Sequence, residues 1–135
     1  MSSITRILCG IILLTVPSII YGGYFLLTIL TGSSKLALTD FQKSMFRAGH
    51  AHAGVLVIVS LIAEILTDQA SLGIGAVWMV RIGFPLAAIL VSGGFFAAAG
   101  SKGATRPNGL IAILYLGITL LVISLIILGI GLVSS

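Results

Sequence analysis

Four long and almost uninterrupted apolar stretches restrict what this chain can fold into. They cover residues 7–30, 46–67, 77–99 and 109–132, and together they take up most of the 135 residues. A helix needs about 20 apolar residues to cross the hydrocarbon core of a bilayer. We therefore predict an all-α integral membrane protein, a four-helix bundle with short connections and a single transmembrane domain over residues 1–135.

Charged residues are few, and their positions predict the orientation in the membrane. Seven Lys and Arg residues and three Asp and Glu residues give a net charge of +4. No basic cluster points to nucleic acid, so the lipid bilayer is the expected partner. Basic residues favour cytoplasmic connections, and they gather in the first and third connections (Lys35, Lys43, Arg47, Lys102 and Arg106). This pattern predicts that both termini are extracytoplasmic.

Two similar segments suggest an internal duplication. Residues 21–25 read Tyr-Gly-Gly-Tyr-Phe, and residues 92–96 read Ser-Gly-Gly-Phe-Phe. A duplicated helical hairpin would produce a bundle with pseudo-two-fold symmetry. We keep this as a hypothesis.

Polar residues share one face of the second predicted helix. Successive residues of an α-helix turn by about 100°, so residues three or four apart lie on the same side. That face carries Arg47, His50, Gly54, Val57, Leu61, Glu64 and Asp68. Ionisable side chains are costly in hydrocarbon and usually point into the protein. We therefore expect this face to be turned inward.

The other three helices each carry a face of small and polar residues, which membrane helices use for close packing. In the first helix these are Gly10, Pro17, Tyr21, Tyr24, Thr28 and Thr31. In the third they are Arg81, Pro85, Ala88, Ser92 and Ala99. In the fourth they are Asn108, Ala112, Tyr115, Thr119 and Gly129. The predicted polar interior therefore consists of Tyr24, Thr28, Arg47, His50, Glu64, Arg81, Ser92, Asn108 and Tyr115.

Glu64 and Arg81 are predicted to form an ion pair. Both lie a few residues from the turn that joins their helices, so they reach a similar depth. One interpretation is a buried pair that fixes the hairpin. The other is a working carboxylate at Glu64 that exchanges protons or binds a cation.

The segment Arg47-Ala48-Gly49-His50-Ala51-His52-Ala53-Gly54 is the one recognisable chemical motif. Histidine ligates metals or haem iron and carries protons near neutral pH. Residues two apart diverge by about 200° on a helix, so His50 and His52 are poorly placed to hold one ion together. A structural role for His50 is also open, with hydrogen bonds to Tyr24, Thr28 or Asn108.

Two resemblances follow from these residues. The His-Ala-His run resembles His-x-His segments in membrane subunits of haem-copper oxidase relatives. This resemblance implies haem b ligation by His50 or His52. The other predicted helices contain no histidine, so a second histidine ligand would have to come from another subunit. The run Phe46 to Gly54, together with Tyr115-Leu116-Gly117, is similar to uncharacterised small four-span bacterial membrane proteins. That resemblance implies a multi-pass protein of the bacterial cytoplasmic membrane.

No arrangement of residues typical of a hydrolase, transferase or metalloprotease is present. We therefore predict a non-enzymatic membrane subunit or a bundle that binds a small ligand, as a homo-oligomer or within a larger complex. Proton-linked transport through an oligomer and haem binding are the alternatives.

Overall fold

The computed structural model describes residues 1–135 and contains four helices and no strands. They are α1 (Ser3–Leu30), α2 (Asp40–Thr67), α3 (Ile74–Ala98) and α4 (Ile111–Val133). The predicted all-α fold is thus confirmed. Each helix is long and apolar enough to cross a membrane, with 23 to 28 residues and a mean hydropathy of 1.7 to 2.9. These four helices make the chain a multi-pass membrane protein.

Helices α1 and α2 both begin several residues before their apolar stretches, and a side-chain cap fixes each start. Thr39 accepts a hydrogen bond from the Gln42 backbone, and the Gln42 side chain accepts one from the Thr39 backbone. This capping box starts α2 at Asp40, six residues before its apolar stretch. Ser2 caps α1 by accepting a hydrogen bond from the backbone of Thr5.

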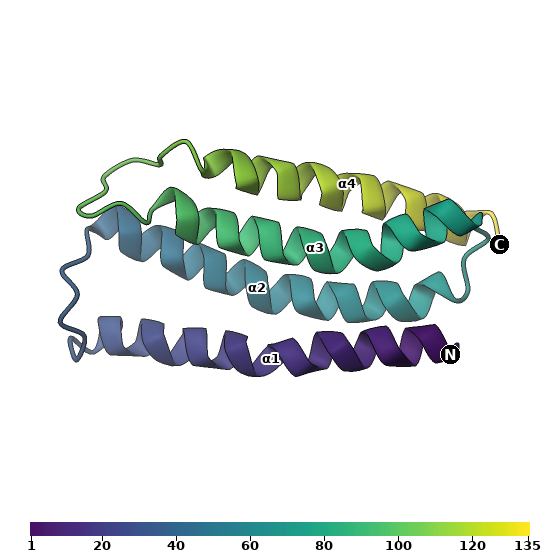
Figure 1. The fold of residues 1–135 in the computed structure, drawn as a ribbon, viewed down its shortest axis with the longest axis horizontal. Coiled ribbons are helices and arrows are strands. Elements are labelled where there is room, and N and C mark those ends of the chain that lie inside the picture. Colours follow the sequence, from purple (N-terminus) through teal and green to yellow (C-terminus); the bar gives the residue numbers. More distant parts are fainter.

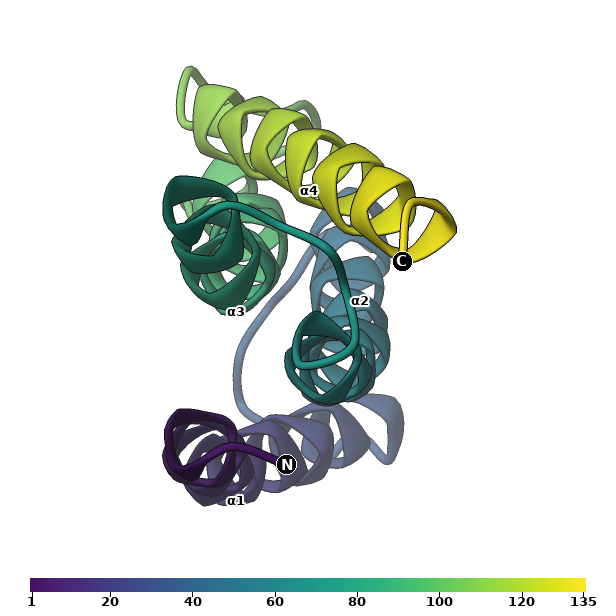
Figure 2. The same cartoon turned by 90° about the vertical axis from the view of Figure 1, so that its right-hand side faces the viewer.

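The helices run alternately up and down, and α2 and α3 lie between the other two (Figure 1). Viewed along the bundle, α1 and α4 lie on opposite sides (Figure 2). Helix α1 packs mainly on α2, and α4 packs mainly on α3. Both termini lie at the end where α2 turns into α3, as expected for four spans.

Glycines bring α3 and α4 very close together. A Cβ atom added at Gly94 would lie 2.6 Å from the backbone nitrogen of Leu114, and one added at Gly117 would lie 2.7 Å from that of Val91. Such small residues permit the backbone approach that drives helix association in lipid. The first hairpin lacks contacts of this kind: Gly22 and Gly23 face the His50 side chain instead. The two hairpins of the proposed duplication are therefore packed differently.

The predicted inward face of α4 is wrong. Ala112, Tyr115, Thr119 and Gly129 are all exposed, with Tyr115 at 61%. The buried residues of α4 are Leu114, Gly117, Ser124, Leu128 and Gly131. Packing follows the glycines that admit α3, because van der Waals contact between helices matters more in lipid than polarity.

The predicted inward face of α1 is also wrong at its tyrosines. Tyr21 and Tyr24 are 72% and 62% exposed. The buried residues of α1 are Thr5, Ile12 and Leu26. Only three of its 28 residues are buried, so α1 is the least enclosed helix of the four.

Candidate functional site

A buried polar cluster joins three helices at the end that carries the termini. The Arg81 guanidinium lies 3.1 Å from a carboxylate oxygen of Glu64 and 2.9 Å from one of Asp68. It also donates a hydrogen bond of 3.0 Å to the Thr5 hydroxyl. Glu64 and Arg81 are buried, with side chains 1% and 7% exposed. The predicted ion pair is confirmed, and it belongs to a larger group.

Asp68 attaches the start of α1 to this cluster. It accepts hydrogen bonds from the Ser2 backbone N–H at 2.6 Å and from the Thr5 hydroxyl at 2.7 Å. These bonds, with the Arg81 guanidinium beside the same carboxylate, hold the pKa of Asp68 well below its usual range. Sequence reasoning placed Asp68 on the right face but missed Thr5 and Ser2. A serine before an apolar run is a signal for the helix cap at Ser2, but nothing in the sequence places Thr5 beside Asp68.

The cluster has the geometry of a structural clamp. Arg81 contacts both carboxylates and a hydroxyl, and Thr5 in turn donates to Asp68. A buried charge is tolerated when it is paired and hydrogen-bonded in this way. The arrangement favours the structural interpretation of Glu64 over the working one.

The two histidines lie on different sides of α2. The His50 ring packs against α1, where Cβ atoms added at Gly22 and Gly23 would lie 3.5 Å and 3.2 Å from its nitrogens. The His52 ring stacks on Phe95 of α3 with centroids 4.9 Å apart, and its Nδ1 lies 2.8 Å from the Ala48 carbonyl oxygen. A haem at His50 would require α1 to move away from α2.

The expected hydrogen bonds of His50 to Tyr24, Thr28 or Asn108 are not formed. Thr28 donates to the Phe25 carbonyl of its own helix, and Asn108 donates to the Ala97 carbonyl at 3.0 Å. His50 has no hydrogen-bond partner within the chain, and its ring fills the space left by two glycines. Asn108 therefore organises the third connection and does not face the bundle interior.

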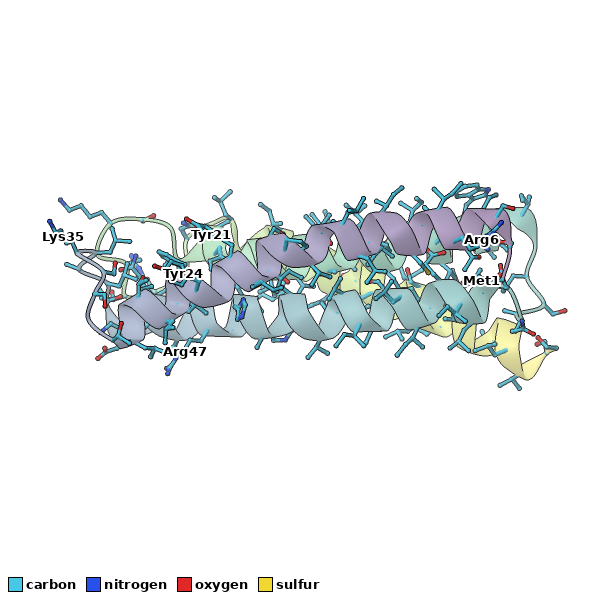
Figure 3. All side chains as sticks on the ribbon, turned by 90° about the horizontal axis from the view of Figure 1, so that it is seen from below. Met1, Arg6, Tyr21, Tyr24, Lys35 and Arg47 are labelled. Carbon is cyan, nitrogen blue, oxygen red and sulfur yellow. The ribbon has the colours of Figure 1, made fainter.

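The remaining predicted residues separate into two places. The prediction that Arg47 faces the interior is wrong: Arg47 is exposed and lies beside the end of α1, where α2 enters the bilayer. Lys35 lies in the adjoining connection, and Figure 3 shows both residues at the end opposite Met1 and Arg6. Ser92 is buried in the C-terminal half of α3, with an exposed fraction of 8%. Arg47 and Ser92 line two separate cavities.

The cavity at Ser92 lies between α1, α2 and α3 and has a volume of about 260 Å³. It is lined mostly by apolar side chains, with four hydroxyls among them. The lining residues are Ile11, Ile12, Thr15, Ser18, Ile19, Ala53, Val57, Ser60, Pro85, Ala88, Ile89 and Ser92. Val57 belongs to the predicted inward face of α2, and Pro85, Ala88 and Ser92 belong to that of α3. These four residues do point inward, and the three helices leave space between them.

Ser92 differs from the other hydroxyls of this cavity. Thr15, Ser18 and Ser60 each donate to a carbonyl of their own helix at 2.6 to 2.7 Å. The Ser92 Oγ atom is buried and has no hydrogen-bond partner. Ser124 is the other buried hydroxyl without a partner, but it is pressed against Gly83 in the closed α3–α4 contact. Of these two buried hydroxyls without a hydrogen-bond partner, only that of Ser92 lines the cavity.

No family model, curated protein or solved structure matches this chain. No three His, Cys, Asp or Glu residues are grouped so that they could hold a metal ion. The candidate site is therefore defined by its own geometry, as a small apolar cavity with one free hydroxyl.

Proposed function

We propose that this protein is a non-enzymatic ligand-binding bundle of the membrane. Its site is the cavity between α1, α2 and α3, and its ligand is a small, largely apolar molecule that carries one oxygen able to accept a hydrogen bond. The free Ser92 hydroxyl in an otherwise apolar cavity is the observation that supports this proposal.

The energetics of Ser92 favour a polar partner. A buried polar group without a hydrogen bond costs about 1–3 kcal/mol. A ligand oxygen placed at Ser92 would remove that cost while its apolar part fills the rest of the cavity. This combination of apolar walls and a few placed polar groups is typical of small-molecule sites.

The volume limits the size of the ligand. A cavity of roughly 150 Å³ is enough to hold benzene, and pockets for drug-sized molecules begin near about 300 Å³. At about 260 Å³, the cavity suits a molecule between these sizes. One or two rings with a carbonyl or hydroxyl group match this description.

The surroundings favour access from the bilayer and binding without turnover. Thr15 and Ser18 of α1 and Ile89 of α3 line the cavity and are also exposed on the outer surface. A molecule dissolved in the hydrocarbon therefore reaches the cavity between these two helices. None of the twelve lining residues is ionisable, so the cavity offers no general acid or base.

The test compares 1-naphthol with naphthalene, because the two differ by one hydroxyl. Binding is measured by fluorescence to the protein in lipid nanodiscs. A net hydrogen bond of about 0.5–1.5 kcal/mol predicts that the wild type prefers 1-naphthol by about two- to tenfold. Ser92→Ala should remove that preference, while Ser124→Ala, the matched loss of an unpartnered hydroxyl, should keep it.

A second variant tests the cavity independently of Ser92. Ala88→Phe places a large side chain in the cavity and should abolish binding of both probes. Binding of both probes at wild-type strength by Ala88→Phe would refute the site. Equal preference for 1-naphthol in the wild type and in Ser92→Ala would refute the role of the hydroxyl.

A further inference from the structure

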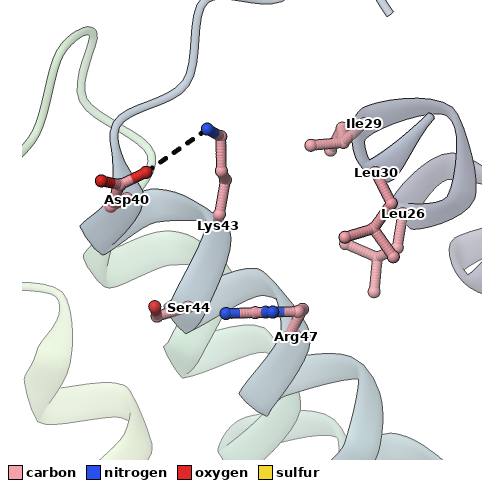
Figure 4. A pocket seen from close by; sticks show the side chains of 7 residues that line it. All are labelled: Leu26, Ile29, Leu30, Asp40, Lys43, Ser44 and Arg47. Carbon is pink, nitrogen blue, oxygen red and sulfur yellow. Dashed lines mark hydrogen bonds and ion pairs between the residues drawn. The ribbon is translucent and has the colours of Figure 1, made fainter. Parts of the chain in front are cut away.

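A second cavity, of about 340 Å³, lies at the opposite end of the α1–α2 hairpin from the clamp. One wall is the apolar last turns of α1, formed by Leu26, Ile29 and Leu30. The other wall is the first two turns of α2. Figure 4 shows the three aliphatic side chains across a gap from Lys43 and Arg47.

The α2 wall has more hydrogen-bond donors than acceptors. The Lys43 ammonium lies 3.4 Å from a carboxylate oxygen of Asp40, and the Asp40 side chain is fully exposed. Arg47 has no acidic partner, and neither Arg47 nor the Ser44 hydroxyl forms a hydrogen bond within the protein. Two cations therefore face one carboxylate at this wall, and the guanidinium is free to bind an anion.

The position in the membrane defines the kind of anion. Asp40 begins α2 outside its apolar stretch, so Lys43 and Arg47 lie where the helix enters the bilayer. Leu26, Ile29 and Leu30 reach the same level from α1, and Lys35 adds a further cation in the connection. Charged groups on one side of a groove and aliphatic groups on the other complement a molecule with an anionic head and an acyl chain.

We propose that this cavity binds an anionic phospholipid. Arg47 holds the headgroup phosphate through its planar fork of donors, Ser44 and Lys43 add further donors, and one acyl chain lies along Leu26, Ile29 and Leu30. Free phosphate would use the same donors but leave the aliphatic wall uncovered. This proposal does not depend on the ligand proposed for the cavity at Ser92.

The experiment uses native mass spectrometry of the full chain in detergent with phosphatidylglycerol or phosphatidylcholine as the probe. Wild type is expected to retain phosphatidylglycerol at least about fivefold more strongly than phosphatidylcholine. Arg47→Gln should lose most of this preference. Arg106→Gln is the matched control, because Arg106 is an exposed arginine in the connection between α3 and α4, at the same end of the bundle, and does not line the cavity.

Two further arms decide between sources of the anion. Leu30→Ser weakens only the aliphatic wall and should reduce retention of phosphatidylglycerol, and 10-fold excess inorganic phosphate should leave it bound. Complete displacement by inorganic phosphate would show a free-anion site and overturn the lipid assignment. Equal losses in Arg47→Gln and Arg106→Gln would show unspecific attraction and overturn it as well. Because Arg47 is exposed and unbonded, Arg47→Gln should keep the wild-type circular dichroism spectrum.

Discussion

Replacing Arg81 by glutamine is expected to destabilise the protein more than any other single change in the clamp. Glu64 is 1% exposed and accepts its only hydrogen bond from Arg81. Without Arg81 its charge is buried and unpaired, which costs about 3–5 kcal/mol. Asp68 keeps its bonds from Ser2 and Thr5, so the loss falls mainly on Glu64.

The reverse change, Glu64→Gln, should cost less. Arg81 would still contact Asp68 at 2.9 Å and Thr5 at 3.0 Å, so the guanidinium stays paired. The loss is then one charge-assisted hydrogen bond, worth about 1.5–3 kcal/mol. The two single variants are expected to differ because Arg81 pairs with two carboxylates, whereas Glu64 pairs with Arg81 alone.

The double variant Glu64→Gln/Arg81→Gln should be more stable than Arg81→Gln alone by about 2 kcal/mol. Removing both charges leaves no unpaired carboxylate at position 64, and replacing both partners of a buried pair is often nearly neutral. Asp68 loses Arg81 in both variants but keeps its hydrogen bonds from Ser2 and Thr5 and the Met1 ammonium at 4.0 Å. The corresponding double-mutant cycle should show a coupling of at least about 2 kcal/mol.

Free energies of unfolding in mixed micelles, from titration with sodium dodecyl sulfate and helicity as the signal, measure all three variants. Arg6→Gln is the matched control at the same end, since Arg6 is exposed and bonds only to the Ser3 hydroxyl, at 3.3 Å. It should stay within about 0.5 kcal/mol of the wild type. A double variant whose loss equals the sum of the two single losses would refute the clamp as a coupled unit.

Three further predictions concern other parts of the chain. Because the pKa of Asp68 is lowered in the folded protein, its stabilisation is complete at neutral pH and is lost as the pH falls below about 3.9, its usual value; the stability difference between wild type and Asp68→Asn should shrink from pH 7 to pH 3, and a constant difference would contradict this. Gly94→Ala should lower the free energy of unfolding by about 1–3 kcal/mol, because the added Cβ overpacks the α3–α4 contact, whereas Gly93→Ala meets open space and should not. Equal melting temperatures of the two variants would show that α3 and α4 can move apart without cost. Because the His50 ring lies against α1, the visible spectra of wild type and His50→Ala should match, and a Soret band that His50→Ala removes would show haem binding.

The sequence predicted the ion pair well because a short turn fixes the geometry. Glu64 and Arg81 both lie within two turns of the connection between α2 and α3, so helical rise brings them to within about one turn of the same depth, and the long arginine side chain spans the rest. The same reasoning placed Glu64 correctly on the inward face of α2 but failed at Arg47, which is exposed at the other end of that face. What it could not supply was the third helix of the clamp, since Thr5 reaches Asp68 only after α1 has packed on α2.

The inward faces of α1 and α4 could not be predicted from polarity. Apart from a few hydroxyl groups, both helices are largely apolar, so no side is favoured by the hydrophobic effect once lipid surrounds them. Tyr115 and Tyr24 point outward because glycines and aliphatic residues on other faces allow closer packing. The cavity at Ser92 could not be predicted from the sequence either, because it exists only as the space that three packed helices leave between them.

The uneven attachment of α1 connects these observations. At one end the clamp fixes Thr5 to Asp68 and Arg81, and at the other end Phe25 packs on Phe46 with ring centroids 6.4 Å apart. Between these points α1 borders the cavity and shares little buried surface with its neighbours, whereas α3 and α4 are in backbone contact. Motions of low cost occur where few buried contacts must break. The proposed ligand would therefore displace the middle of α1 on entering from the bilayer, and the α3–α4 pair that encloses Ser124 would stay in contact.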